Sequence, residues 1–184
     1  MFIQTEPTPN PATLKFIPGR SVLGEGTADF RSKEEAEASP LAQRLFDIAG
    51  VKGVFFGSDF ISVTKTDGED WRHMKPAILG AIMDHYMTGQ SVMGDAAQAT
   101  AGEDYDPKDE ETVATIKELL ETRVRPAVAN DGGDIVFHGF RDGVVMLHMR
   151  GACAGCPSST ATLRHGIENL LRHFCAEVQE VRPV

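Results

Sequence analysis

The stretch DGGDIVFHGFRDGVVMLHMRGACAGCPSS at residues 131–159 decides the fold of the C-terminal half of this chain. Two β-rich runs, 135–140 and 144–149, flank Asp142-Gly143. An Asp-Gly pair favours a type I′ hairpin, because both central residues of that turn need positive φ. The Asp131-Gly132-Gly133-Asp134 run is typical of a turn, and its two acids are interpreted as turn formers rather than as a catalytic pair. The stretch therefore predicts a turn followed by a β-hairpin.

Cys153 and Cys156 follow the hairpin in a Cys-x-x-Cys motif. Pro157 is a favoured first residue of a helix, so we expect Cys153 just past a strand end and Cys156 at a helix N-terminus. One apolar face of that helix contains Leu163, Ile167, Leu170 and Phe174. Unpaired backbone N–H groups and the helix dipole lower the pKa of a thiol at such a position. Thiolates are soft ligands, so the motif predicts that Cys153 and Cys156 hold an iron–sulfur cluster, zinc or copper(I).

The number of thiolates limits how such a site is completed. A [2Fe-2S] or [4Fe-4S] cluster usually has four cysteine ligands, and this motif supplies two of them. The third cysteine, Cys175, lies about 28 Å from Cys156 along a straight helix, which is too far to share a metal. A second copy of the chain, related by a two-fold axis, would supply the missing thiolates. The residues therefore predict a homodimer bridged by a cluster of either type, and a cluster at such a junction can leave, as a carrier requires.

Composition changes near the middle of the chain. Residues 93–107, MGDAAQATAGEDYDP, are rich in Ala, Gly and Asp, which predicts a flexible linker at residues 92–108. We expect an N-terminal α+β domain at residues 1–91 and a cluster-binding α+β domain at residues 109–184. In the second domain a helix is marked by Val113, Ile116, Leu120 and Val124. Pro126 is expected to limit that helix, and a short final strand is expected around Val178 and Val181.

The N-terminal domain shows strand and helix patterns but no chemical motif. We expect strands at 2–5, 13–17, 51–56 and 60–64, and helices at 40–49 and 71–87. The apolar face of the last helix contains Met74, Ile78, Ile82 and Tyr86. His73 and His85 are isolated, and they are interpreted as solvated or packed side chains rather than as ligands.

Charge and hydropathy exclude several classes of protein. The net charge is −9, which argues against a nucleic-acid partner, because phosphate binding requires a basic face. The sequence contains no apolar run long enough to span a bilayer. It begins with no recognisable signal or transit peptide, so a cytoplasmic location is expected.

Three other interpretations of the cysteines compete with the cluster. A thiol–disulfide redox protein of thioredoxin type would need a βαβ unit before the motif, and here a hairpin precedes it. A structural zinc site would need further ligands, and neither His148 nor His165 has the usual spacing, although four cysteines of a dimer could bind zinc. Inert buried cysteines are poorly compatible with a Gly-flanked pair at a helix N-terminus. We predict no catalytic residue, and hence that the protein is not an enzyme.

Several motifs together resemble those of a known protein family. Asp131-Gly132-Gly133-Asp134-Ile135 and the run Gly151 to Ser159 with its following helix resemble the NifU C-terminal domain. The N-terminal half resembles the N-terminal domain of Nfu-type scaffold proteins. The matching runs are Thr8-Pro9-Asn10-Pro11, Leu14-Lys15-Phe16, Ser39-Pro40-Leu41-Ala42, Val54-Phe55-Phe56-Gly57 and Asp59-Phe60-Ile61. The resemblance implies a [4Fe-4S] cluster shared between two chains, loaded by a donor scaffold and delivered to client apo-proteins. It implies Cys153 and Cys156 as ligands and assigns no role to Cys175.

Overall fold

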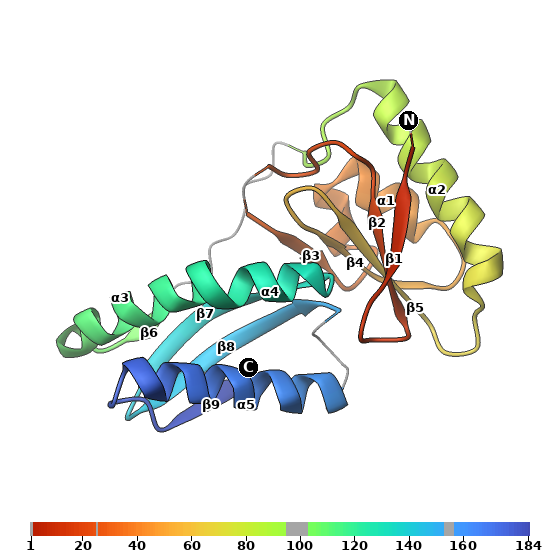
Figure 1. Ribbon diagram of the computed structural model, residues 1–184. Coiled ribbons are helices and arrows are strands. Elements are labelled where there is room, and N and C mark those ends of the chain that lie inside the picture. The colour runs from red at the N-terminus through yellow and green to blue at the C-terminus, as the bar shows by residue number, and fades with distance from the viewer. Residues whose placement is uncertain (1, 25, 95–102, 153–156) are drawn as a thin grey trace. The chain divides into compact units, whose positions relative to one another are not determined.

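The structure is a computed structural model that describes residues 2–24, 26–94, 103–152 and 157–184 (Figure 1). Two compact units divide the chain, Met1–Gln98 and Ala99–Val184, and both combine helices with a sheet. The fold class is therefore α+β, as predicted. No helix in the described ranges is long and apolar enough to cross a membrane.

The N-terminal unit contains an antiparallel sheet with the strand order β1-β2-β5-β4-β3. Its strands are β1 (Gln4–Pro7), β2 (Thr13–Ile17), β3 (Ala28–Phe30), β4 (Val51–Phe56) and β5 (Ile61–Lys65). Helices α1 (Pro40–Phe46) and α2 (Trp71–Thr88), with the 3-10 helix η1 (Glu35–Ala38), complete the unit. Apolar side chains of α1 and α2 pack with those of one sheet face into a single core.

The predicted elements of this unit are present, with corrections at their ends. The first strand is Gln4–Pro7 rather than 2–5, and β5 begins one residue later than expected. Helix α1 ends at Phe46 because the chain then turns: the Ile48 N–H donates to the Leu45 carbonyl, and Gly50 has a φ of 91°. Strand β3 and helix η1 were not predicted, since neither has a clear apolar period.

The C-terminal unit contains a four-stranded sheet with the order β6-β7-β8-β9. Its strands are β6 (Asp104–Tyr105), β7 (Gly133–Arg141), β8 (Val144–Gly151) and β9 (Glu180–Pro183). Strands β7 and β8 form the predicted hairpin, and Asp142 and Gly143 have φ values of 52° and 79°, as a type I′ turn requires. Parallel pairing adds β6 beside β7 and β9 beside β8.

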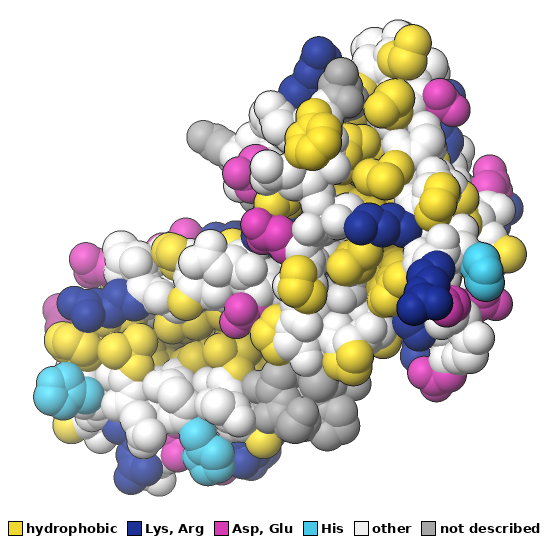
Figure 2. Space-filling model, turned by 45° about the vertical axis from the view of Figure 1, so that its right-hand side comes forward, with side chains coloured by type: hydrophobic (Ala, Val, Ile, Leu, Met, Phe, Trp, Pro, Cys, Tyr) yellow, Lys and Arg dark blue, Asp and Glu magenta, His cyan; other side chains and the backbone are white. Residues whose placement is uncertain are grey.

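Helices lie over one face of this sheet (Figure 1). They are η2 (Pro107–Asp109), α3 (Glu110–Leu119), the π-helical turn η3 (Leu120–Val124), α4 (Arg125–Asn130) and α5 (Pro157–Phe174). Figure 2 shows apolar atoms exposed between the two rows of helices. The Arg123 guanidinium, in the π-helical turn η3, lies 5.3 Å from the centre of the Phe174 ring at the end of α5.

Several predictions about residues 92–184 were wrong. The helix does not stop near Pro126: the Arg125 N–H donates to the Leu120 carbonyl across the π-helical turn, so Pro126 stands in the first turn of α4, where no N–H is needed. The buried residue near the end of α5 is Leu171, whereas Phe174 is 50% exposed. The expected linker at 92–108 is too long, because Val92 is buried in the N-terminal core and β6 and η2 are regular structure.

Candidate metal centre

The two predicted ligands, Cys153 and Cys156, lie outside the described residues, but the chain on both sides of them is described. Strand β8 ends at Gly151, whose φ of 64° is a left-handed conformation that favours glycine. Helix α5 begins at Pro157, as predicted. The motif therefore connects the end of a strand to the beginning of an 18-residue helix.

The segment before the motif is fixed to the turn that follows α4. Ala152 is 3% exposed, and its N–H donates to the Gly132 carbonyl at 3.2 Å. Gly151 pairs with Gly133 at the end of the hairpin. The Gly132 N–H in turn donates to the Ala129 carbonyl at 3.0 Å, which ties the turn to α4. The residue directly before the Cys-x-x-Cys motif is thus held by the backbone of the Asp131-Gly132 turn.

A buried ion pair lies beside this turn. Asp134 is in β7, not in a turn as predicted, and its side chain is 4% exposed. The Arg125 Nε donates to Asp134 Oδ1 at 2.9 Å, and the Arg125 Nη2 donates to Asp134 Oδ2 at 3.1 Å. Arg125 Nη1 also donates to Glu121 Oε1. The hydrogen bond to Asp134 is the main cause of a raised pKa of Arg125. Sequence reasoning missed this pair, because nothing local couples residues nine positions apart.

Cys175 is separate from the loop. It is 4% exposed, and burial, helped by the charge of Glu177, raises the pKa of its thiol. It follows the C-terminal end of α5, and an 18-residue helix is about 27 Å long. A buried, protonated thiol at that distance from the start of α5 is a packing residue.

Within the described residues, the histidines weighed as zinc ligands belong to no group of metal-binding side chains. His148 belongs to β8, and His165 is on the exposed side of α5. Across the described ranges, no three His, Cys, Asp or Glu side chains form a group that could hold a metal ion.

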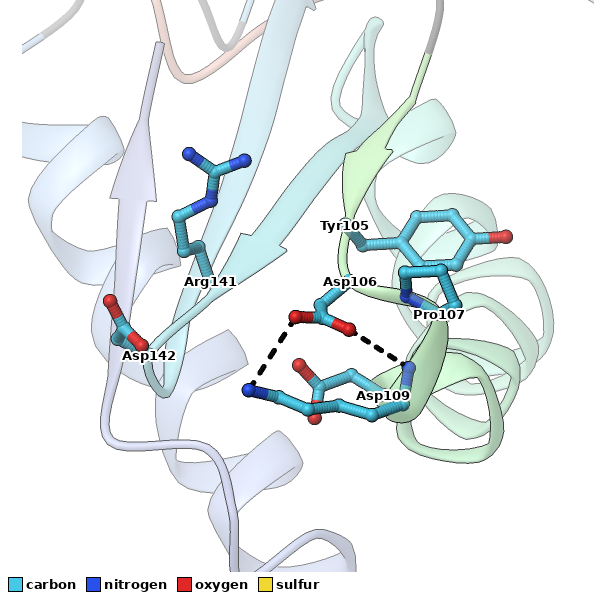
Figure 3. A pocket seen from close by; sticks show the side chains of 7 residues that line it. Tyr105, Asp106, Pro107, Asp109, Arg141 and Asp142 are labelled. Carbon is cyan, nitrogen blue, oxygen red and sulfur yellow. Dashed lines mark hydrogen bonds and ion pairs between the residues drawn. The ribbon is translucent and has the colours of Figure 1, made fainter.

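A polar pocket lies near the opposite end of the hairpin, at the Asp142-Gly143 turn (Figure 3). Its lining residues are Tyr105, Asp106, Pro107, Lys108, Asp109, Arg141 and Asp142, and its volume is about 390 Å³. Charged groups here already pair with one another: Lys108 Nζ lies 3.5 Å from Asp106 Oδ2, and Arg141 pairs with Asp104 at 2.9 Å. The Lys108 backbone N–H lowers the pKa of Asp106. The pocket is therefore not an extension of the cysteine site.

Comparison with known protein families gives the class of protein first. A family described as "Scaffold protein Nfu/NifU N terminal" matches residues 3–89, and one described as "NifU-like domain" matches residues 116–182. The first match lies in the N-terminal unit and the second in the unit that carries the Cys-x-x-Cys motif. The chain thus has the domain organisation of an Nfu-type scaffold.

Curated relatives agree along the whole chain. "NFU1 iron-sulfur cluster scaffold homolog, mitochondrial" of Homo sapiens is 50% identical, over all of this chain and 72% of that protein. "NifU-like protein 4, mitochondrial" of Arabidopsis thaliana is 54% identical, over 98% of this chain and 65% of that protein. The Drosophila sechellia NFU1 homolog is 51% identical, and this chain spans 65% of its length. The chain belongs to the Nfu family of iron–sulfur cluster scaffold proteins.

Proposed function

We propose that this chain carries an iron–sulfur cluster as cargo and holds it through the thiolates of Cys153 and Cys156. A second copy supplies the other two thiolates, the cluster is of the [4Fe-4S] type, and client apo-proteins receive it. The observation that carries the proposal is a Cys-x-x-Cys segment between the end of a buried hairpin and the start of a long helix, in a chain of this scaffold family.

The donor set suits such a cargo. Two thiolates per chain give four in a dimer, the number that a cubane cluster requires. The described residues contain no group of three or more His, Cys, Asp or Glu side chains that could hold a metal ion, and Cys175 lies beyond the far end of α5. We therefore propose that a second molecule supplies the missing ligands. A cluster held between two molecules is released when they separate, which supports a carrier rather than a protein with a resident cofactor.

The names of the relatives bear on the predicted location and partners. The relatives are named as scaffolds, and their names place them in mitochondria, so they lend no support to the predicted cytoplasmic location. We propose that a donor scaffold loads the chain, that clients remove the cluster by thiolate exchange, and that no reaction is catalysed. The N-terminal unit would recognise partners.

Anaerobic reconstitution with iron and sulfide tests this function. Iron, sulfide and protein are assayed across the size-exclusion peak of the wild type, of Cys153→Ala and of Cys175→Ser, which serves as the cysteine-removing control. We expect about four irons and four sulfides per dimer in the wild type and in Cys175→Ser, and none in Cys153→Ala. A Cys153→Ala protein that loads normally contradicts the ligand assignment. A monomer that cycles a Cys153–Cys156 disulfide would establish the redox alternative, and tight zinc without iron the structural one.

A further inference from the structure

The Arg125–Asp134 pair differs from the other ion pairs of the described residues. Its carboxylate is 4% exposed, whereas the acids of the remaining pairs are at least 14% exposed. Both oxygens of Asp134 accept from the guanidinium, through Nε and Nη2. A fork of this kind fixes distance and direction together, which a single-point ammonium contact cannot do.

Stability alone is a weak reason for such a pair. Desolvating two charges costs several kcal/mol, and replacing a buried pair by apolar side chains is often neutral or stabilising. What the pair does uniquely is geometric. It joins the first residue of α4 to the second residue of β7, and so connects the two ends of segment 125–134, which contains α4 and the turn after it.

The braced segment carries the backbone group that holds Ala152, which precedes Cys153. Gly132 lies within it, and the Gly132 carbonyl accepts the Ala152 N–H at 3.2 Å. Ala152 is the last described residue before Cys153. Asp134 also follows Gly133 directly, and Gly133 pairs with Gly151. A shift of α4 against β7 would therefore move Gly151 and Ala152.

The π-helical turn contributes to this arrangement. Its extra residue rotates the next helical segment, α4, relative to the course of a continuous α-helix, and the first residue of α4 is Arg125. Glu121, within the π-helical turn, accepts from the Nη1 of Arg125. The guanidinium thus contacts a carboxylate on each side, and its orientation is set by both.

We propose that Arg125 and Asp134 are positioning residues for the cluster: their ion pair braces the Gly132 carbonyl, which holds Ala152, the residue directly before the ligand Cys153. The inference rests on the proposed function, since it assigns these residues to the same cysteine site. Groups that hydrogen-bond directly to a metal ligand typically change metal affinity by about 10- to 100-fold when they are replaced. The Arg125–Asp134 pair acts through the Gly132–Ala152 hydrogen bond instead, so we expect a smaller effect.

The test uses two variants of the full chain and a matched control. Arg125→Lys keeps the charge but loses the fork. Arg125→Met with Asp134→Leu removes both charges and leaves neither unpaired. Arg141→Lys makes the same conservative change at the exposed Arg141–Asp104 pair, at the other end of the hairpin. The readouts are cluster half-life under an iron chelator, visible circular dichroism of the cluster, melting temperature without cluster, and amide hydrogen exchange at Ala152 in the cluster-free protein.

We expect both Arg125 variants to lose the cluster about two- to ten-fold faster than the wild type, below the range for direct partners of a ligand, with an altered dichroism spectrum and faster exchange at Ala152. Arg141→Lys should match the wild type in every readout. A double variant that melts like the wild type and keeps its cluster as long overturns the proposal, as does faster Ala152 exchange with an unchanged cluster half-life. If the double variant fails to fold, Arg125→Lys decides by the same criteria. A wild type that takes up no cluster refutes the proposed function instead, and Ala152 exchange still reports whether the brace exists.

Discussion

His85 gives the N-terminal unit a testable dependence on pH. The side chain has no exposed surface, and neither ring nitrogen has a hydrogen-bond partner in the described part of the chain. Its ring packs edge-on against Tyr86, with 5.7 Å between the ring centres. Burial lowers the pKa of His85, and the charge of Arg44 lowers it further. The nearby backbone of Gln90 opposes the shift without meeting the geometry of a hydrogen bond to either ring nitrogen.

The sign of the effect follows from this lowered pKa. Below the unfolded-state pKa of about 6.5, His85 binds a proton in the unfolded chain but not in the folded unit. The free energy of unfolding therefore falls as the solution becomes more acidic. The slope is up to about 1.4 kcal/mol per pH unit, until the pH reaches the lowered pKa of the folded state. Above about pH 6.5 the contribution of His85 is fully retained.

The assay uses the only tryptophan of the chain, Trp71, which begins α2 of the same unit. Urea unfolding followed by Trp71 fluorescence, from about pH 7.5 to about pH 5.5, measures the slope. His85→Leu removes the titrating group and the two unpaired nitrogens, each of which costs roughly 1–3 kcal/mol. We expect that variant to be at least as stable as the wild type near neutral pH and to show a shallower loss in acid. His73→Leu, at an exposed position of the same helix, is the control.

Two results would refute this reasoning. Equal slopes for the wild type and His85→Leu would mean that His85 does not titrate between the folded and unfolded states. A large loss of stability in His85→Leu at neutral pH would mean that the ring nitrogens are hydrogen-bonded, for instance to an internal water molecule.

Three further substitutions test the packing of each unit. Ser39→Ala removes a buried N-cap that accepts from the Ala42 N–H and donates to the Val92 carbonyl; we expect a loss of about 1–3 kcal/mol by Trp71 fluorescence, and an unchanged midpoint would contradict the cap. Leu171→Ala truncates a fully buried side chain of the C-terminal core, which should cost about 2–5 kcal/mol in calorimetry, and a loss below about 1 kcal/mol would argue against that burial. Gly139→Ala would place a Cβ 2.4 Å from the Asp104 carbonyl oxygen, so β6 should detach, as faster amide exchange there would show; unaltered protection would disprove the close approach.

Local patterns predicted much of the framework because they depend on residues close in sequence. The Asp142-Gly143 turn has a conformation that its two residues favour, and α5 begins at Pro157, a residue suited to that position. Strand β4 has the predicted bounds, since its apolar run ends at a glycine. Local patterns predicted less well which apolar side chains of an element are buried, because packing against other elements decides this. Helix α5 buries Leu171 and exposes Phe174, although both are apolar.

By itself, the sequence determined the two-unit α+β organisation, the hairpin and the Cys-x-x-Cys motif between a strand and a helix, since turn chemistry, periodicity and ligand type are local properties. Only the tertiary structure decided that Asp134 is a buried partner of Arg125 and that the Ala152 N–H reaches the Gly132 carbonyl. It also decided that His85 is buried with no hydrogen-bond partner for its ring nitrogens among the described residues. Such contacts join residues far apart in the chain, and their geometry depends on the packing of helix against sheet. Residue type alone does not specify that packing.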